Sequence, residues 1–150
     1  MGRLIVLVLA AALGWYAYGK YFRDSEPVHA YKQFAKAWAN GRPDQARDLT
    51  AGPSVDRTIV EQSLYNLMGG IPVQNVHGVD FSIESEFPRG SSVVITAVQT
   101  VAYDPPGTAS ALGGVAKADV RQTVEMTETA DGWKVISFQP VLLDDGLGLR

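Results

Sequence analysis

The chain has 150 residues, 46% of them hydrophobic, which suffices for one compact domain with its own core but not for two. It has no cysteine, so disulfides, thiolate nucleophiles and thiolate metal sites are excluded in any compartment. After residue 23 the net charge is −6, from 10 Lys and Arg (13 less Arg3, Lys20 and Arg23) against 16 Asp and Glu, so we expect no nucleic-acid partner and no anionic lipid partner.

An uncharged apolar run occupies residues 4–18, and aromatic residues follow it through Phe22. Counted through Phe22, the run reaches the roughly 20 residues that a membrane span needs, with its aromatic rings at headgroup level. We therefore predict a transmembrane signal anchor over residues 1–23, with residues 4–22 in the lipid bilayer. The alternative is a cleaved signal peptide, with Arg3 before the apolar run and a cut after Gly19.

The positive charges that flank this run are nearly balanced, since Arg3 and the α-amino group face Lys20 and Arg23. A very short N-terminal tail ahead of a signal-like segment usually stays in the cytoplasm. We therefore expect a single-pass membrane protein whose C-terminal domain is extracytoplasmic, as in a periplasm.

Three helices are predicted after the anchor. Ser25 caps the first, which carries its apolar residues on one stripe and ends at Asn40-Gly41. Pro43 starts a short second helix. A third helix runs from about Ser54 until Gly69-Gly70 stops it. The stripe of the first helix consists of Val28, Tyr31, Phe34, Ala35 and Trp38.

From Val73 onward the period of the apolar residues changes from 3.6 to 2, which indicates strands. A half-buried strand around residues 79–84 is followed by a strand over residues 92–103 that is apolar on both faces. After a loop rich in Gly, Pro and Ala, residues 120–126 alternate again, and Asp131-Gly132 closes a hairpin into a last strand. We expect residues 144–150 to form a flexible tail.

Two segments carry a family resemblance, residues 34–46 (FAKAWANGRPDQA) and residues 131–135 (DGWKV). With the order of the elements, they make residues 26–141 resemble the NTF2-like (cystatin-like cone) superfamily. The resemblance implies an α+β domain over residues 24–143, in which three helices pack on a bent antiparallel sheet of about four strands. It also implies a conical cavity between the sheet and the first helix.

Ketosteroid isomerase-like members of that superfamily use a tyrosine on the first helix, an acidic base after the second helix and a carboxylic acid on a strand. In this chain the tyrosine position falls near Phe34, which has no hydroxyl. Asp56 stands in the segment of the base, but as an exposed residue of a first helical turn. We therefore expect no catalytic residues, although an enzyme that uses the cone remains an alternative.

Histidines, acids and aromatic residues are the remaining candidates for binding. A metal site needs converging ligands, which we do not expect at His29 or His77, so we expect no metal site and no cofactor. Three acids alternate along the first strand, on a face that we expect to be solvated. Large aromatic residues of a small domain form its core or line its pocket. The three acids are Asp80, Glu84 and Glu86, and the core or pocket residues are Phe34, Trp38, Phe81 and Trp133, with Trp133 expected to be buried against the first helix.

On the second strand, one of two apolar sets must point away from the helices. The sets are Val94, Thr96 and Val98, or Val93, Ile95 and Ala97. An exposed apolar patch is unfavourable unless a partner covers it. We therefore expect a protein partner or a homo-oligomer contact there, and assign the interface to Val94 and Val98.

Together these features predict a membrane-anchored, non-catalytic binding or assembly subunit of an envelope or membrane complex. Two alternatives stay open. The domain could bind a small molecule or catalyse a reaction in its cone, or it could be a secreted soluble domain after signal cleavage.

Overall fold

The structure is a computed structural model that describes residues 6–14, 23–107 and 111–148. Residues 6–14 are helical, whereas residues 4–5 and 15–22 of the expected span lie outside the described residues. No helix within the described ranges has both the length and the apolar character to cross a membrane.

The longest helix of the domain is α2 (Glu26–Ala39), and it begins as the sequence predicts. The Ser25 side chain accepts a hydrogen bond from the backbone N–H of Val28, and Pro27 occupies the first turn. All five residues of the predicted apolar stripe are buried. The short helix α3 (Pro43–Arg47) follows after Gly41, whose φ of 64° suits a helix end.

The predicted third helix is two helices, α4 (Pro53–Glu61) and α5 (Leu64–Leu67). Ser63 caps α5 by accepting a hydrogen bond from the backbone N–H of Asn66. The Asn66 side chain in turn donates to the last carbonyl groups of α4, at 3.3 Å from Val60 and 3.0 Å from Glu61. These caps satisfy backbone groups at both helix ends, so the described part of the domain has four helices rather than three.

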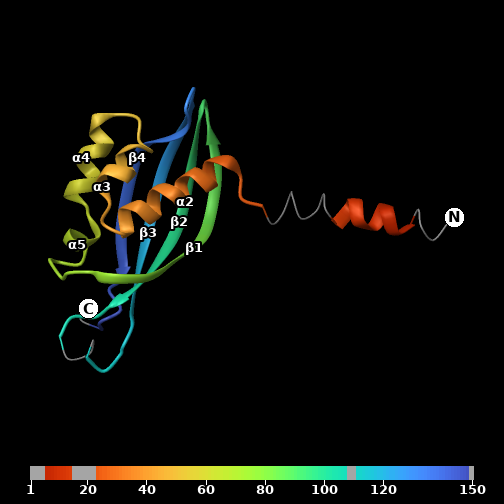
Figure 1. Cartoon of the computed structure of the whole chain (residues 1–150). Coiled ribbons are helices and arrows are strands. Elements are labelled where there is room, and N and C mark those ends of the chain that lie inside the picture. Colours follow the sequence, from red (N-terminus) through yellow and green to blue (C-terminus); the bar gives the residue numbers. More distant parts are fainter. Residues whose placement is uncertain (1–5, 15–22, 108–110, 149–150) are drawn as a thin grey trace.

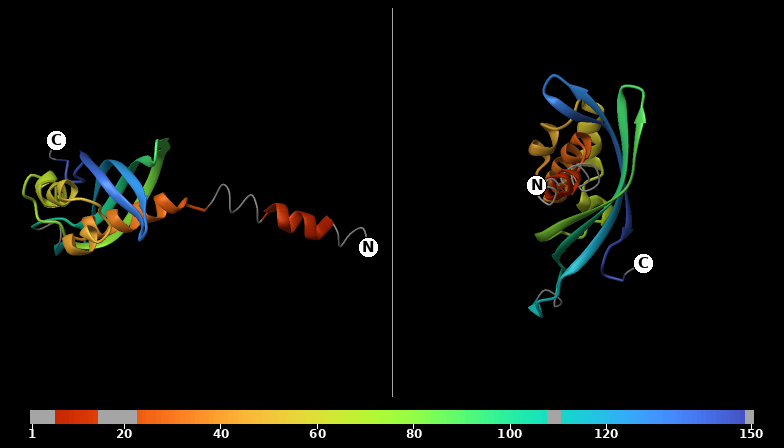
Figure 2. Two further views of the ribbon diagram at one scale, coloured as in Figure 1. Left: turned by 90° about the horizontal axis from the view of Figure 1, so that it is seen from above. Right: turned by 90° about the vertical axis from the view of Figure 1, so that its right-hand side faces the viewer.

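The four strands form one antiparallel sheet in the order β1-β2-β3-β4. Their bounds are β1 (Gln74–Arg89), β2 (Ser92–Asp104), β3 (Ala116–Thr129) and β4 (Gly132–Asp144). The sheet curves around α2, and the helices of the domain lie against one of its faces (Figures 1 and 2). We call this the inner face of the sheet, and the opposite one the outer face. The α+β architecture and the four-stranded antiparallel sheet agree with the predicted fold class.

Strand β2 shows which apolar set faces the helices. Ile95 and Ala97 are fully buried on the inner face, whereas Val94 and Val98 lie half-buried on the outer face. Phe81, on the inner face of the neighbouring β1, packs edge-on against Tyr31 of α2. The outward set is therefore the one that contains the predicted interface residues.

The predicted acidic face of β1 needs a correction. The pairing of β1 with β2 shifts between Ile83 and Ser85, where Glu84 is an extra residue. Beyond this bulge Glu86 pairs with Ile95 of the inner set, so it does not share a face with Asp80. Its carboxylate instead accepts a hydrogen bond from the Ser25 hydroxyl at 2.6 Å.

The chain after β4 also differs from the flexible tail that the sequence predicts. Asp145 is 6% exposed, and its carbonyl oxygen accepts a hydrogen bond from the Tyr103 hydroxyl at 2.7 Å. Gly146 lies directly against the backbone of Lys117 in β3. Residues 144–147 thus pack on the domain, and residues 149–150 lie outside the described residues.

Candidate functional site

The space between α2 and the sheet, where the fold would offer a conical cavity, is filled by side chains. Tyr31, Gln99 and Gln122 have no solvent exposure. The Tyr31 hydroxyl donates to Gln122 Oε1 at 2.7 Å, and Gln122 Nε2 donates to Gln99 Oε1 at 2.6 Å. This series of hydrogen bonds ends at α2, where Gln99 Nε2 donates to the carbonyl oxygen of Ala35 at 2.9 Å. We call these three side chains the buried polar chain.

The hydroxyl group of Tyr31 in the buried polar chain is not free to take part in a reaction. Burial raises the pKa of the Tyr31 phenol above its ordinary value, so the group stays protonated. Its single hydroxyl proton is already donated to Gln122. Tyr31 therefore serves as a structural donor within the core.

Aromatic rings occupy another part of the interior. Phe138 of β4 meets Phe34 edge-on at a centroid distance of 5.0 Å and Trp38 at 5.3 Å. Trp38 is 3% exposed, and its indole N–H has no hydrogen-bond partner in the described part of the chain. Among the four predicted core or pocket residues, Phe34 and Trp38 are thus core.

The other two predicted residues lie at the edge of the core. Phe81 is half-buried, with the Lys32 ammonium 5.9 Å from its ring centroid. Trp133 is also half-buried, which corrects the prediction that it is buried against the first helix. It opens onto a surface cleft because it stands directly after the β3–β4 turn.

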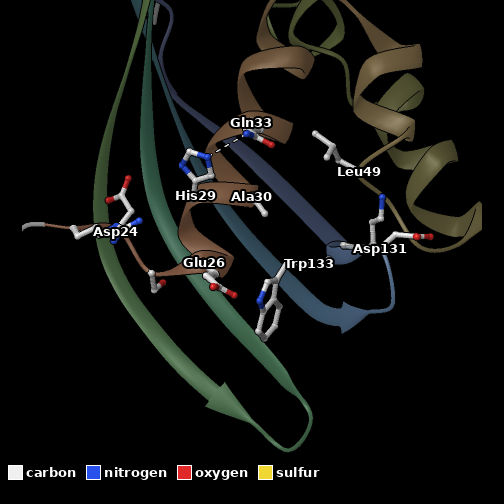
Figure 3. Close-up of a pocket in the computed structure, with 12 residues that line it drawn as sticks. Asp24, Glu26, His29, Ala30, Gln33, Leu49, Asp131 and Trp133 are labelled. Atoms are coloured by element: carbon white, nitrogen blue, oxygen red, sulfur yellow. Dashed lines mark hydrogen bonds between the residues drawn. The ribbon is translucent and has the colours of Figure 1, made fainter. Parts of the chain in front are cut away.

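This cleft lies between the N-terminal end of α2 and the β3–β4 hairpin, and we call it the α2 cleft (Figure 3). Its volume is about 840 Å³. Half-buried Ala30, Leu49 and Trp133 form its apolar part. The other lining residues are Arg23, Asp24, Ser25, Glu26, His29, Gln33, Asp131, Gly132 and Lys134.

Some polar groups of the α2 cleft have hydrogen-bond partners within the described part of the chain, and others have none. His29 Nε2 lies 3.2 Å from Gln33 Nε2, and Lys134 Nζ donates to the carbonyl oxygen of Asp48 at 2.6 Å. By contrast, the carboxylates of Glu26 and Asp131 have neither an ion pair nor a hydrogen bond with any described residue. Both residues are exposed, so their carboxylates are available to a ligand.

A second polar cluster joins the beginning of β1 to the end of β2. The Asp104 carboxylate contacts His77 Nε2 at 2.5 Å and accepts from Asn75 Nδ2 at 2.8 Å. These hydrogen bonds, first that of His77, lower the pKa of Asp104. Within the described ranges, no three His, Asp or Glu side chains are placed to hold a metal ion.

The predicted interface residues lie on the outer face of the sheet. Val94 pairs with Phe87 of β1, whose side chain is 66% exposed. Val98 stands opposite Arg121, which forms an ion pair with Glu84 at 3.2 Å. The outer face thus combines apolar side chains with a charged pair, rather than the uniformly apolar patch that alternation suggested.

Reasoning from the sequence missed the buried polar chain. One signal was present, because Gln122 interrupts an otherwise apolar set that includes Val120 and Val124 on the inner face of β3. A glutamine in such a set needs a buried partner. Its partners Tyr31 and Gln99 are 91 and 23 residues away in the chain, so the sequence alone does not identify them.

Comparisons with known proteins show the fold. No protein-family model and no curated protein matches the sequence. A ketosteroid isomerase-like protein from Erwinia carotovora atroseptica SCRI1043 superposes with a TM-score of 0.54 at 10% identity, over 79% of this chain and 95% of that one. A putative dehydratase from the NTF2-like family from Streptomyces avermitilis superposes with a TM-score of 0.52 at 17% identity, over 79% of this chain and 94% of that one. The fold of this chain is therefore NTF2-like.

Proposed function

We propose that this chain is a membrane-anchored docking subunit. In this proposal residues 4–22 hold it in a bilayer, and its NTF2-like domain binds a protein partner on the extracytoplasmic side without catalysing a reaction. The sequence supports the anchor through the length of its apolar run and the aromatic residues that follow it.

The closed interior of the cone is the observation that carries the non-catalytic part of the proposal. A substrate site inside the cone would need a concave space between α2 and the sheet, with a few free polar groups. Here the buried polar chain satisfies its own members, and the aromatic side chains of Phe34, Trp38 and Phe138 pack together. In this proposal the names of the structural neighbours, a ketosteroid isomerase-like protein and a putative dehydratase, describe those proteins and not this chain.

The outer face of the sheet is the surface that we assign to the partner. Phe87 and Val141 are 66% and 56% exposed there, and Val94 and Val98 are half-buried. On the same face the ion pair of Glu84 and Arg121 joins β1 to β3 across β2. Apolar side chains surrounded by polar ones are typical of a protein interface.

The free edge of β1 is a poorer candidate for docking. It carries the bulge at Glu84 and a proline at position 88, and both features discourage the pairing of a further strand. The edge of β4 is partly occupied, because Val135 exchanges backbone hydrogen bonds of 2.9 Å with Leu49 and Ala51. The face of the sheet, rather than its edges, is therefore the expected contact.

The anchor is tested by washing membranes with alkaline carbonate and sequencing the N-terminus of the retained protein. Retention of a chain whose N-terminal peptide is intact supports the anchor. A mature chain that begins near Lys20 would mean a cleaved signal and a secreted soluble domain.

Docking is tested with a charge on each face of β2. Val98→Glu puts a carboxylate on the outer face opposite Arg121, so the domain should fold and complex formation should be lost. Ile95→Glu buries a charge on the inner face and should unfold the domain. Circular dichroism follows folding, and cross-linking in membranes followed by mass spectrometry follows the complex. A folded Val98→Glu variant that retains its cross-linked partners would contradict the assignment of this face.

A further inference from the structure

We propose that the α2 cleft rests against the headgroup layer of the bilayer and takes zwitterionic phospholipid headgroups. This inference rests on the proposed anchor, because it uses the place where the apolar segment joins the domain. It adds a second contact surface, distinct from the outer face of the sheet.

The junction between the anchor and the domain is held by specific contacts. The Asp24 carboxylate accepts from Lys32 Nζ at 2.7 Å, and the Ser25 hydroxyl donates to Glu86 of β1 at 2.6 Å. The chain is therefore fixed to the domain from Asp24 onward. In this proposal only Arg23 then stands between the span and the first residue that contacts the domain, so the linker is short.

The distance from the junction to the bilayer is short. Two residues, Arg23 and Asp24, stand between Phe22, the last residue of the expected span, and Ser25. The three Cα–Cα steps from Phe22 to Ser25 reach at most about 11 Å. The headgroup layer is itself roughly 5–8 Å thick on each side of the hydrocarbon. Because Arg23 and Asp24 line the α2 cleft, its mouth lies within reach of the headgroups.

The chemistry of the α2 cleft suits a headgroup that carries both signs of charge. Glu26 and Asp131 present carboxylates without a partner among the described residues, which an ammonium group can approach. Arg23 and Lys134 line the same cleft and can approach a phosphate. The half-buried Trp133 adds an indole, which favours the membrane interface. Anionic headgroups fit less well, because they bring a phosphate but no ammonium group for the two carboxylates.

A depth measurement tests the contact. The chain has no cysteine, so one fluorophore can be attached to the full-length protein through Ala130→Cys, at the β3–β4 turn beside the cleft. Leu112→Cys is the matched control, since it is 88% exposed in the β2–β3 connection at the other end of the strands. In phosphatidylcholine vesicles that contain a headgroup-nitroxide lipid, we expect most of the fluorescence at position 130 to be quenched and little at position 112.

Lipid composition tests the chemistry. Quenching at position 130 should decrease when phosphatidylglycerol replaces phosphatidylcholine. Glu26→Gln combined with Asp131→Asn should remove this preference without affecting folding, because both side chains are exposed. Trp133→Ala should reduce quenching in both lipids.

Three outcomes decide the inference. Equal quenching at positions 130 and 112, or none at 130, in protein that stays in the vesicles would overturn the contact and leave the anchor standing. A preference for phosphatidylglycerol would overturn the zwitterionic assignment. Protein that an alkaline wash removes from the vesicles would overturn the anchor, and this inference with it.

Discussion

At the residue scale, Gly146 shows how closely the end of the chain packs on the sheet. Its φ is 73°, and an added Cβ would lie 2.3 Å from the carbonyl oxygen of Lys117. Gly146→Ala should therefore lower the free energy of unfolding by about 1–3 kcal/mol, measured by urea denaturation. Gly148→Ala is the control, because its φ of 67° carries similar strain but nothing lies within 4 Å. Equal losses in the two variants would mean that Gly146 does not contact Lys117.

Tyr31→Phe tests the buried polar chain. The variant keeps the ring but leaves Gln122 Oε1 without its donor in a fully buried position. We expect a loss of about 1–3 kcal/mol in the free energy of unfolding at neutral pH, the cost of an unsatisfied buried acceptor. Val98→Thr, on the outer face, should change it by less than about 0.5 kcal/mol.

The pH dependence of the free energy of unfolding, compared between wild type and Tyr31→Phe, gives an independent check. Burial raises the pKa of Tyr31 above its ordinary value of 10.0, so the folded state holds this proton more tightly than the unfolded state. The stabilisation is fully present below pH 10 and is lost as the pH rises toward the folded pKa. Urea denaturation from pH 8 to 11 should therefore show wild type losing stability above pH 10 more steeply than Tyr31→Phe. Parallel curves would mean that Tyr31 is not buried.

At the scale of elements, the sequence predicts α2 well because its apolar stripe is continuous, and it places all four strands, although β1 extends beyond the predicted residues 79–84. It does not predict the break between α4 and α5, since that depends on the Asn66 side chain reaching back to the carbonyl groups of Val60 and Glu61. The bulge at Glu84 is hidden for a similar reason. Alternation of apolar and polar residues looks regular through the bulge, and only the pairing with β2 shows the extra residue.

Strand β4 offers a matched comparison of two large aromatic residues. Phe138 is 4% exposed and contacts both Phe34 and Trp38, whereas Trp133 is half-buried beside the α2 cleft. Phe138→Ala should cost about 3–5 kcal/mol of unfolding free energy. Trp133→Ala should cost less, about 1–3 kcal/mol. Thermal or urea unfolding ranks the two, and a larger loss for Trp133→Ala would mean that it belongs to the core.

At the scale of the whole molecule, the order of the elements was enough to predict an NTF2-like fold, and the structural neighbours agree with it. Whether the cone is open or closed was not predictable. That property depends on contacts between residues far apart in the chain, such as Tyr31 with Gln122 and Phe34 with Phe138. The candidate site was therefore predicted only as a list of aromatic residues. In the structure Phe34 and Trp38 belong to the core, Phe81 lies at its edge beside Lys32, and Trp133 lines the α2 cleft.

The closed cone leads to a last prediction, which bears directly on the docking proposal. Phe34 has no solvent exposure and meets Phe138 edge-on, so Phe34→Ala should cost about 3–5 kcal/mol and leave an apolar cavity. An apolar cavity of this kind stays dry and binds small apolar molecules. Benzene should therefore raise the melting temperature of Phe34→Ala and leave that of wild type unchanged, with circular dichroism confirming that the variant folds. If benzene stabilises wild type as well, the native cone already has room for a ligand, and a small-molecule function would replace docking as the better explanation of this domain.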